Sequence, residues 1–237
     1  MNNSNRGNLW LRWVIANGVG EMVGLGLTFA IAVEVISSFG NGQSVMVILA
    51  SFLVAVASGA IEATMVGVAQ WWAMHPWFPV ITRRAWWLAT LVGALVAYVL
   101  GYLPSTLMSL GEQSTQSQAA AAEPAQWLIL IMAAGLGAVG GAVLSFTQWL
   151  SMRSKVRGAS SWIPANMLAW ALGMPLIFWG IDTAQKLAGM VWVVVFIAGV
   201  LLVTGLLVGA IHGVFLMRIA EHHSPEGLKT GSIISPY

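Results

Sequence analysis

Three ionisable side chains interrupt stretches of this chain that are otherwise strongly apolar. They are Glu21, Glu62 and His212. A charged side chain inside a bilayer costs several kcal/mol, so an acid there is protonated, paired or beside water, and it is a candidate for function. Since no Lys or Arg occurs in the middle of these stretches, His212 is the basic side chain that could pair with Glu21 or Glu62. These residues favour ligand or ion binding, and the alternative is that both acids are protonated and bonded to nearby backbone.

Neutral hydrogen-bonding side chains recur beside these residues in two repeated motifs. The first motif reads Trp13, Asn17, Gly20 and Gly24, then Trp86, Thr90, Gly93 and Ala97, then Trp162, Asn166, Ala169 and Gly173. The second motif reads Ala63, Gly67 and Gln70, then Gly141, Ser145 and Gln148, then Gly205, Gly209 and His212. Offsets of 0, 4, 7 and 11 place the members of the first motif on one face of a helix. Each motif therefore predicts a helix that presents the same surface in every copy.

Together the two motifs predict a two-helix hairpin that is repeated three times, over residues of about 10–78, 79–157 and 158–220. We expect the hairpins to surround a pseudo-threefold axis. The polar members would then meet at one depth, and they are Asn17, Gln70, Thr90, Gln148, Asn166 and His212. Interhelical hydrogen bonding is the structural interpretation of this ring, and a ligand or ion site is the alternative. The two acids break the repeat, because the positions equivalent to Glu21 hold Ala94 and Trp170.

The composition predicts an all-α membrane protein. Hydrophobic residues make up 58% of the chain and charged residues 8%, against about 25% charged residues in a soluble domain. The mean hydropathy is +0.82. About 20 helical residues cross the hydrocarbon core, and six stretches are long enough. We place them at residues 11–38, 44–73, 86–104, 126–150, 162–181 and 189–217.

The basic residues predict the orientation of these spans. Arg and Lys gather before the first span, in the connections after the second and fourth spans, and after the sixth, whereas the opposite connections hold only Lys186. The positive-inside rule then gives cytoplasmic N and C termini. We expect residues 1–220 to form a single bundle, residues 221–237 a disordered cytoplasmic tail, and residues 104–126 a long outer connection. The net charge of +2 reflects this topology and does not indicate a nucleic-acid partner.

Tryptophan and small residues are expected to have structural roles. Several tryptophans near the basic ends of the spans suggest interfacial anchors, with a stacking platform for a pigment or headgroup as the alternative. They are Trp71, Trp72, Trp77, Trp86, Trp87, Trp149 and Trp162. Stripes of Gly, Ala and Ser allow helix backbones to approach closely in lipid.

Enzymatic activity finds no support in the sequence. The chain has no cysteine, which excludes disulfides and thiolate metal sites. It also lacks a nucleotide-binding lysine motif, a nucleophile elbow and a zinc-protease helix. We therefore predict a non-enzyme without a metal or cofactor, and a bound lipid or pigment is the alternative.

The Gln-Trp pairs that close two spans, Gln70-Trp71 and Gln148-Trp149, precede basic residues and the next copy of the tryptophan motif. In this the chain resembles a loose group of uncharacterised bacterial multi-pass membrane proteins with repeated Gln-Trp hairpins. The third copy departs from the pattern, with His212-Gly213 in place of Gln-Trp. The resemblance implies a bacterial cytoplasmic (inner) membrane location and implies no activity.

Two classes of function follow from these features. The first is a non-catalytic accessory or scaffold subunit in the lipid bilayer, which packs against other membrane subunits or binds a hydrophobic ligand. The second is a small-solute or ion transporter with an intramembrane site at Glu21, Glu62 and His212. We expect the site of either function to draw on the same set of residues, namely Glu21, Glu62, His212, Gln70, Gln148, Asn17 and Asn166.

Overall fold

The protein is described by a computed structural model, which covers residues 3–39, 44–114 and 124–223. Within these ranges the chain is helical and contains no strand. The helices are α1 (Asn3–Ser38), α2 (Val45–Met74), α3 (Arg83–Ser114), α4 (Gln126–Met152), the short 3₁₀ helix η1 (Ala159–Ser161), α5 (Trp162–Ala184) and α6 (Met190–His223).

Six of these helices are long and apolar enough to span a membrane. Their runs of Leu, Val, Ile and Ala leave much apolar surface exposed, for example Leu53 at 64% and Val33 at 65% exposed. Such surface is stable when it faces lipid, and the helical backbone satisfies its own polar groups there. The chain is thus built as a multi-pass membrane protein, as the composition predicts.

Two helix ends differ from the boundaries expected from sequence. Helix α3 continues through Pro104 to Ser114, ten residues beyond the expected end of the third span at residue 104, so the start of the expected connection over 104–126 is wrong. The hydroxyls of Ser105 and Thr106 both donate to the carbonyl of Tyr102, at 2.9 Å, and add bonds in the turn that contains the proline. Serine and threonine bonds of this kind help a membrane helix to tolerate proline. Residues 115–123 of the connection lie outside the described residues.

At the other end of the chain, helix α6 runs to His223, six residues beyond the expected end of the sixth span. The expected disordered tail over 221–237 is therefore wrong for residues 221–223, and residues 224–237 lie outside the described residues. Glu221 forms an ion pair of 2.7 Å with Arg6 near the start of α1. The beginning of α1 and the end of α6 thus meet.

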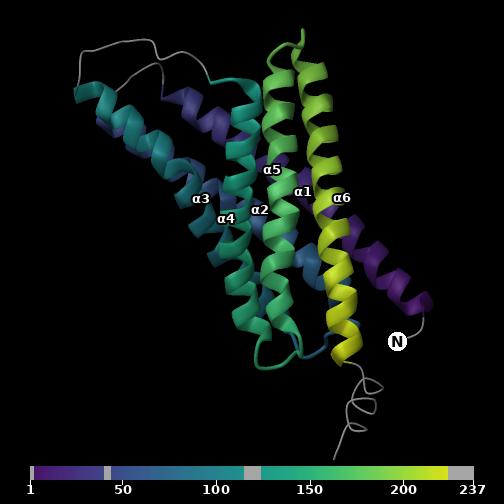
Figure 1. The fold of residues 1–237 in the computed structure, drawn as a ribbon. Coiled ribbons are helices and arrows are strands. Elements are labelled where there is room, and N and C mark those ends of the chain that lie inside the picture. Colours follow the sequence, from purple (N-terminus) through teal and green to yellow (C-terminus); the bar gives the residue numbers. More distant parts are fainter. Residues whose placement is uncertain (1–2, 40–43, 115–123, 224–237) are drawn as a thin grey trace, which may run out of the picture.

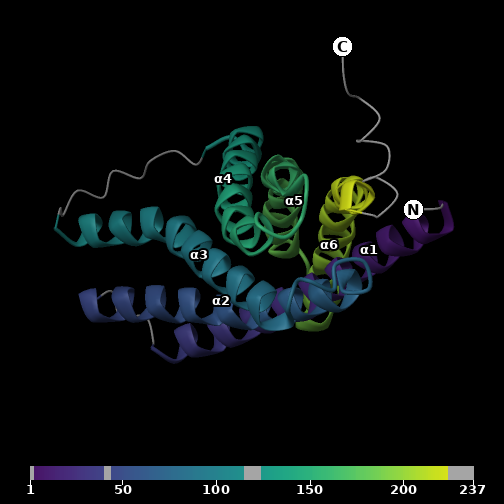
Figure 2. The ribbon, with the colours of Figure 1, turned by 90° about the horizontal axis from the view of Figure 1, so that it is seen from below.

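The helices form a closed ring in which each packs on the next helix along the chain and α6 packs on α1. They converge at the end that carries the connections 75–82 and 153–161, which we call the basic end because Arg83, Arg84, Arg153, Lys155 and Arg157 lie in or beside these connections. Away from the basic end, α1, α2 and α3 lean away from α4, α5 and α6 (Figure 1). The view along the bundle shows the same two groups of helices (Figure 2).

Glycines sit where the helices come closest. A methyl group on Gly141 of α4 would lie 2.6 Å from the carbonyl oxygen of Asn166 in α5, and one on Gly205 of α6 would lie 2.6 Å from that of Asn17 in α1. Real carbon atoms do not approach an oxygen so closely, so these positions need glycine. Because close backbone contact stabilises helix pairs in lipid, the small-residue stripes serve packing, as expected.

Candidate functional site

A chain of buried hydrogen bonds joins α1, α2 and α3 near the basic end. Asn17 donates through Nδ2 to the carbonyl of Trp13, at 2.8 Å, which orients its Oδ1 toward the neighbouring helix. Gln70 donates through Nε2 to that Oδ1, at 2.9 Å. The Oε1 of Gln70 in turn accepts from the indole Nε1 of Trp86, at 3.3 Å. One glutamine therefore connects three helices.

The same set of bonds occurs between α3, α4 and α5. Thr90 donates to the carbonyl of Trp86, at 2.9 Å, and accepts from Nε2 of Gln148, at 3.0 Å. The Oε1 of Gln148 accepts from Nε1 of Trp162, at 2.8 Å. A bond of 3.4 Å from Nε2 of Gln148 to Oε1 of Gln70 links the two sets. The expected meeting of these amides and Thr90 inside the bundle is confirmed.

The bonds are incomplete where α5 and α6 meet α1. Asn166 donates to the carbonyl of Trp162, at 2.9 Å, as Asn17 does to that of Trp13. His212 takes the place of a glutamine, and both of its ring nitrogens, like Nε1 of Trp13, find no partner in the described part of the chain. The His212 ring instead packs against Trp13 and Trp162, with centroids 6.4 and 5.2 Å apart.

Trp13, Trp86 and Trp162 form the centre of the core at the basic end. All three are 0% exposed, and their ring centroids are 5.6 to 6.5 Å apart. The expectation that Trp86 and Trp162 anchor the chain in the headgroup region is therefore wrong. Their indole N–H groups find buried glutamine acceptors, so the rings can be buried completely. Trp72 is different, since it is 61% exposed and lies under the guanidinium of Arg12.

The two acids meet each other and do not meet His212. Glu21 is 2% exposed, and its carboxyl interacts with that of Glu62. Glu62 also accepts a hydrogen bond from the hydroxyl of Tyr98 in α3. The expected pairing of Glu21 or Glu62 with His212 is thus wrong. Both ring nitrogens of His212 lack a hydrogen-bond partner among the described residues, so neither carboxyl bonds to the imidazole.

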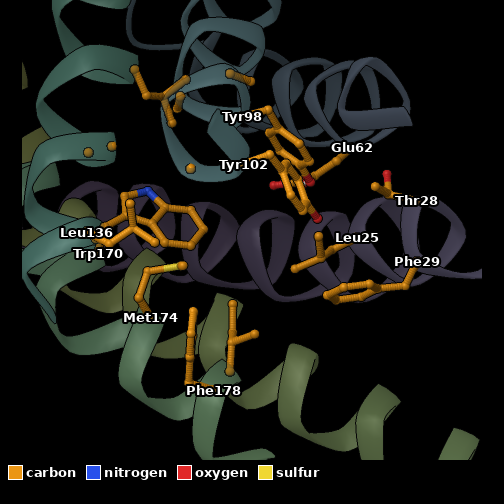
Figure 3. Close-up of a pocket in the computed structure, with 18 of the residues that line it drawn as sticks. Leu25, Thr28, Phe29, Glu62, Tyr98, Tyr102, Leu136, Trp170, Met174 and Phe178 are labelled. Atoms are coloured by element: carbon orange, nitrogen blue, oxygen red, sulfur yellow. The ribbon is translucent and has the colours of Figure 1, made fainter. Parts of the chain in front are cut away.

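Glu62 lines a partly enclosed cavity of about 290 Å³ between the two groups of helices. Figure 3 shows Glu62, Tyr98 and Tyr102 on one side of this cavity, with Trp170, Met174 and Phe178 on the other. Every large helix except α6 contributes to the wall. The cavity residues are Leu25, Thr28, Phe29, Ala32, Glu62, Ala94, Ala97, Tyr98, Gly101, Tyr102, Leu136, Gly137, Gly140, Gly141, Leu144, Trp170, Met174, Ile177, Phe178 and Ile181.

Small residues at two positions of the repeated motifs help to form the cavity. Ala94 and Gly140 occupy positions that correspond to Glu21 and Glu62 in the repeated motifs, and both are small and line the space. A methyl group on Gly140 would touch only Ala97, at 3.9 Å. Together with the divergence of the helices, these small residues leave volume that the acids and Trp170 do not fill.

Polar groups are few in the cavity wall. Thr28 donates a hydrogen bond to the carbonyl of Ser58, at 2.9 Å, so its hydroxyl hydrogen is not available to a ligand in the cavity. The indole Nε1 of Trp170 has no partner among the described residues. Glu62, Tyr98, Tyr102 and Trp170 are therefore the side chains that could orient a bound molecule. No group of three His, Asp or Glu residues that could hold a metal ion occurs in the described ranges.

Sequence reasoning identified Glu62 and missed Tyr98, Tyr102 and Trp170. A signal for the tyrosines was present: the chain has 3 tyrosines in all, and two of them are one helical turn apart in an apolar span. The remaining predicted residues, Gln70, Gln148, Asn17 and Asn166, lie in the hydrogen-bonded core and not in the cavity wall.

Comparisons with protein-family models, with curated proteins and with solved structures found no match to this chain. The resemblance to Gln-Trp hairpin proteins therefore stays a prediction.

Proposed function

We propose that this chain is a non-catalytic membrane protein that binds a hydrophobic ligand within its helix bundle and serves as an accessory or scaffold subunit for other membrane proteins. The observation that carries the proposal is the cavity of about 290 Å³ beside Glu62. Its wall is mostly aliphatic and aromatic, with a few polar groups from side chains such as Glu62, Tyr98 and Trp170. Apolar pockets with a small number of polar groups are typical of small-molecule sites, which begin at about 300 Å³.

The two ends of the bundle differ in structure, and we assign helix packing to the basic end and ligand binding to the region beyond it. At the basic end, bonds from Gln70 and Gln148 hold neighbouring helices together around the three buried tryptophans. The residues that line the cavity lie farther along the helices. The two groups of helices diverge away from the basic end (Figure 1). A fixed end and an open end allow a ligand to enter without disturbing the polar core. The exposed apolar surface is suited to contact with lipid or other subunits.

We also propose how the six spans are arranged in the bundle. We take the bundle as three repeated two-helix hairpins around a pseudo-threefold axis, with both termini in the cytoplasm of a bacterial inner membrane. Support for the repeat comes from the matching bonds of Gln70 and Gln148, each to a tryptophan in the following helix. Support for the orientation comes from the basic residues gathered at one end.

Transport of a small solute or ion is the second candidate. It is favoured by one observation, the contact between Glu62 at the cavity and Glu21 behind it. The separation of His212 from both acids counts against the expected three-residue site. Uptake into liposomes by the wild type, lost in Glu62→Gln, would favour transport over binding alone.

The binding proposal is tested by filling the cavity. A phenylalanine at Gly140 would project into the space, since a methyl group there meets nothing closer than 3.9 Å. The protein is purified from its native membrane in mild detergent, and the lipids and pigments that accompany it are identified by mass spectrometry. We expect a hydrophobic compound with the wild type and its loss from Gly140→Phe.

Gly135→Phe is the matched control, because Gly135 lies in the same helix with no atom near its added methyl group. This variant should keep the ligand. Equal recovery of the compound from Gly140→Phe, or none from the wild type, would refute binding in this cavity.

A further inference from the structure

We propose that the cavity selects a lipophilic monocation, an amine with an apolar body whose ammonium group binds to the carboxylate of Glu62. This inference rests on the proposed function and names the class of its ligand. It is carried by three features of the cavity: an acid without a basic partner, an aromatic wall, and a volume that suits a small organic molecule.

The first feature is the unpaired state of the acids. Among the described residues, Arg6 pairs with Glu221 and Lys186 pairs with Asp182, both near the ends of helices. Neither Glu21 nor Glu62 forms an ion pair in this part of the chain. Glu62 has the Tyr98 hydroxyl as its donor, which leaves further acceptor positions on its carboxylate. A buried carboxylate is stable when a cation and hydrogen-bond donors compensate it. A bound ammonium would supply both.

Glu21 strengthens the preference for a cation. It places a second carboxyl against Glu62, and its Oε2 has no partner among the residues that the structure describes. An anionic ligand is disfavoured in the cavity, because the ionised carboxylate of Glu62 would repel it strongly in a medium of low dielectric constant. No Lys, Arg or His in the described chain lines the cavity to offset this repulsion.

The aromatic wall is the second feature. Tyr98 and Tyr102 lie one turn apart on α3, with ring centroids 5.9 Å apart, and Trp170 lies across the cavity from them (Figure 3). The faces of such rings attract organic cations, most strongly where water is excluded. Glu62 can thus bind the N–H groups of an ammonium while the rings contact its charged end and its apolar body.

The third feature is the size and composition of the space. A volume of about 290 Å³ holds an organic molecule and is far larger than a bare metal ion requires. A metal ion would also lose its water shell to few ligands, since the described residues offer no set of three acidic or histidine ligands. Highly polar solutes would find almost no partners on the aliphatic wall. An amphiphilic amine satisfies both the carboxylate and the wall.

The test uses three probes that share one apolar body: 4-phenylbutylamine, 4-phenylbutanol and 4-phenylbutyrate. Binding of each to the purified full-length protein in nanodiscs is measured by calorimetry at neutral pH. We expect the amine to bind at least about tenfold more tightly than the alcohol, as a charge-assisted hydrogen bond would provide, and the acid to bind weakest. This comparison within the wild type does not depend on the folding of any variant.

Two variants locate the selectivity. Glu62→Gln keeps a partner for Tyr98 and removes the charge, so the amine should bind about as weakly as the alcohol while alcohol binding stays unchanged. Glu34→Gln removes an exposed carboxyl outside the cavity and should leave all three affinities unchanged. Gly140→Phe should abolish binding of the amine and of the alcohol.

The outcomes separate this inference from the proposed function. If the alcohol binds as tightly as the amine and Gly140→Phe removes both, the cavity binds neutral ligands, and only the inference of a cation is overturned. Selectivity for the amine that survives Glu62→Gln would also overturn it. If no probe binds, or binding survives Gly140→Phe, the binding function itself is refuted.

Discussion

Single side chains in this protein decide which helices are joined. Gln70 and Gln148 each donate to the first helix of their own pair and accept from a tryptophan of the next helix. An amide can do this because it carries a donor and an acceptor on one rigid group. In membranes such bonds contribute about 0.6 kcal/mol each on average, so the network matters as much for register as for stability.

His212 offers a direct test at the residue scale. Gln70 and Gln148 accept from Trp86 and Trp162, whereas Trp13 has no acceptor among the described residues. In His212→Gln, the new amide can accept from Nε1 of Trp13, and we expect the free energy of unfolding to rise by about 1 kcal/mol. The midpoint of thermal unfolding in detergent measures the change.

The control for this prediction is His212→Leu, which fills a similar space without an acceptor and should not reproduce the gain. A lower midpoint for His212→Gln than for the wild type would contradict the interpretation that this position corresponds to Gln70 and Gln148.

At the scale of elements, glycine contacts fix how the helices pack. Gly141 lies against the backbone of α5, whereas a methyl group added to Gly135 on the same helix would have no atom of the described residues within 4 Å. The hydrophobic pattern of α4 does not distinguish them, since both are small residues in one apolar span. The repeated motif of the sequence includes Gly141 and not Gly135, and the structure shows how closely Gly141 approaches α5.

The same single methyl group should therefore have opposite effects at these two positions. Gly141→Ala would place its methyl 2.6 Å from the carbonyl oxygen of Asn166, and we expect it to lower the free energy of unfolding by about 1 to 3 kcal/mol. Gly135→Ala should be neutral or stabilising, because alanine favours the helix by about 1 kcal/mol. Thermal unfolding of the two variants side by side checks this, and equal destabilisation would contradict the packing of α4 on α5.

At the scale of the whole molecule, the ring of helices is closed by α1 and α6. Gly205 and Gly209 of α6 approach the backbone of α1, and Arg6 pairs with Glu221. The helices meet at the basic end and diverge beyond it (Figure 1). The tryptophan core therefore forms at the basic end, and the cavity forms farther along the helices. One small bundle can thus contain both the hydrogen-bonded core at the basic end and the cavity.

The proposed orientation can be measured because the chain has no native cysteine. Ser160→Cys lies at the basic end, and Ala188→Cys lies in the connection between α5 and α6, and both positions are exposed. With a membrane-impermeant maleimide applied to spheroplasts, we expect Ala188→Cys to react at once and Ser160→Cys to react only after permeabilisation. The reverse pattern would place the termini outside the cell, and the wild type provides the unlabelled control.

The six spans and the meeting of the polar side chains of α1 to α4 inside the bundle could be predicted from the sequence. Both follow from local rules: about 20 apolar residues cross a bilayer, and helical periodicity places Asn17 or Gln70 on a defined face. Other features became visible only in the folded bundle: the burial of Trp86 and Trp162, the absence of a partner for the His212 ring among the described residues, the contact of Glu62 with Tyr98 and the cavity. These depend on helix tilt and on which side chains from distant spans fill the same space, and periodicity within one helix does not encode that geometry.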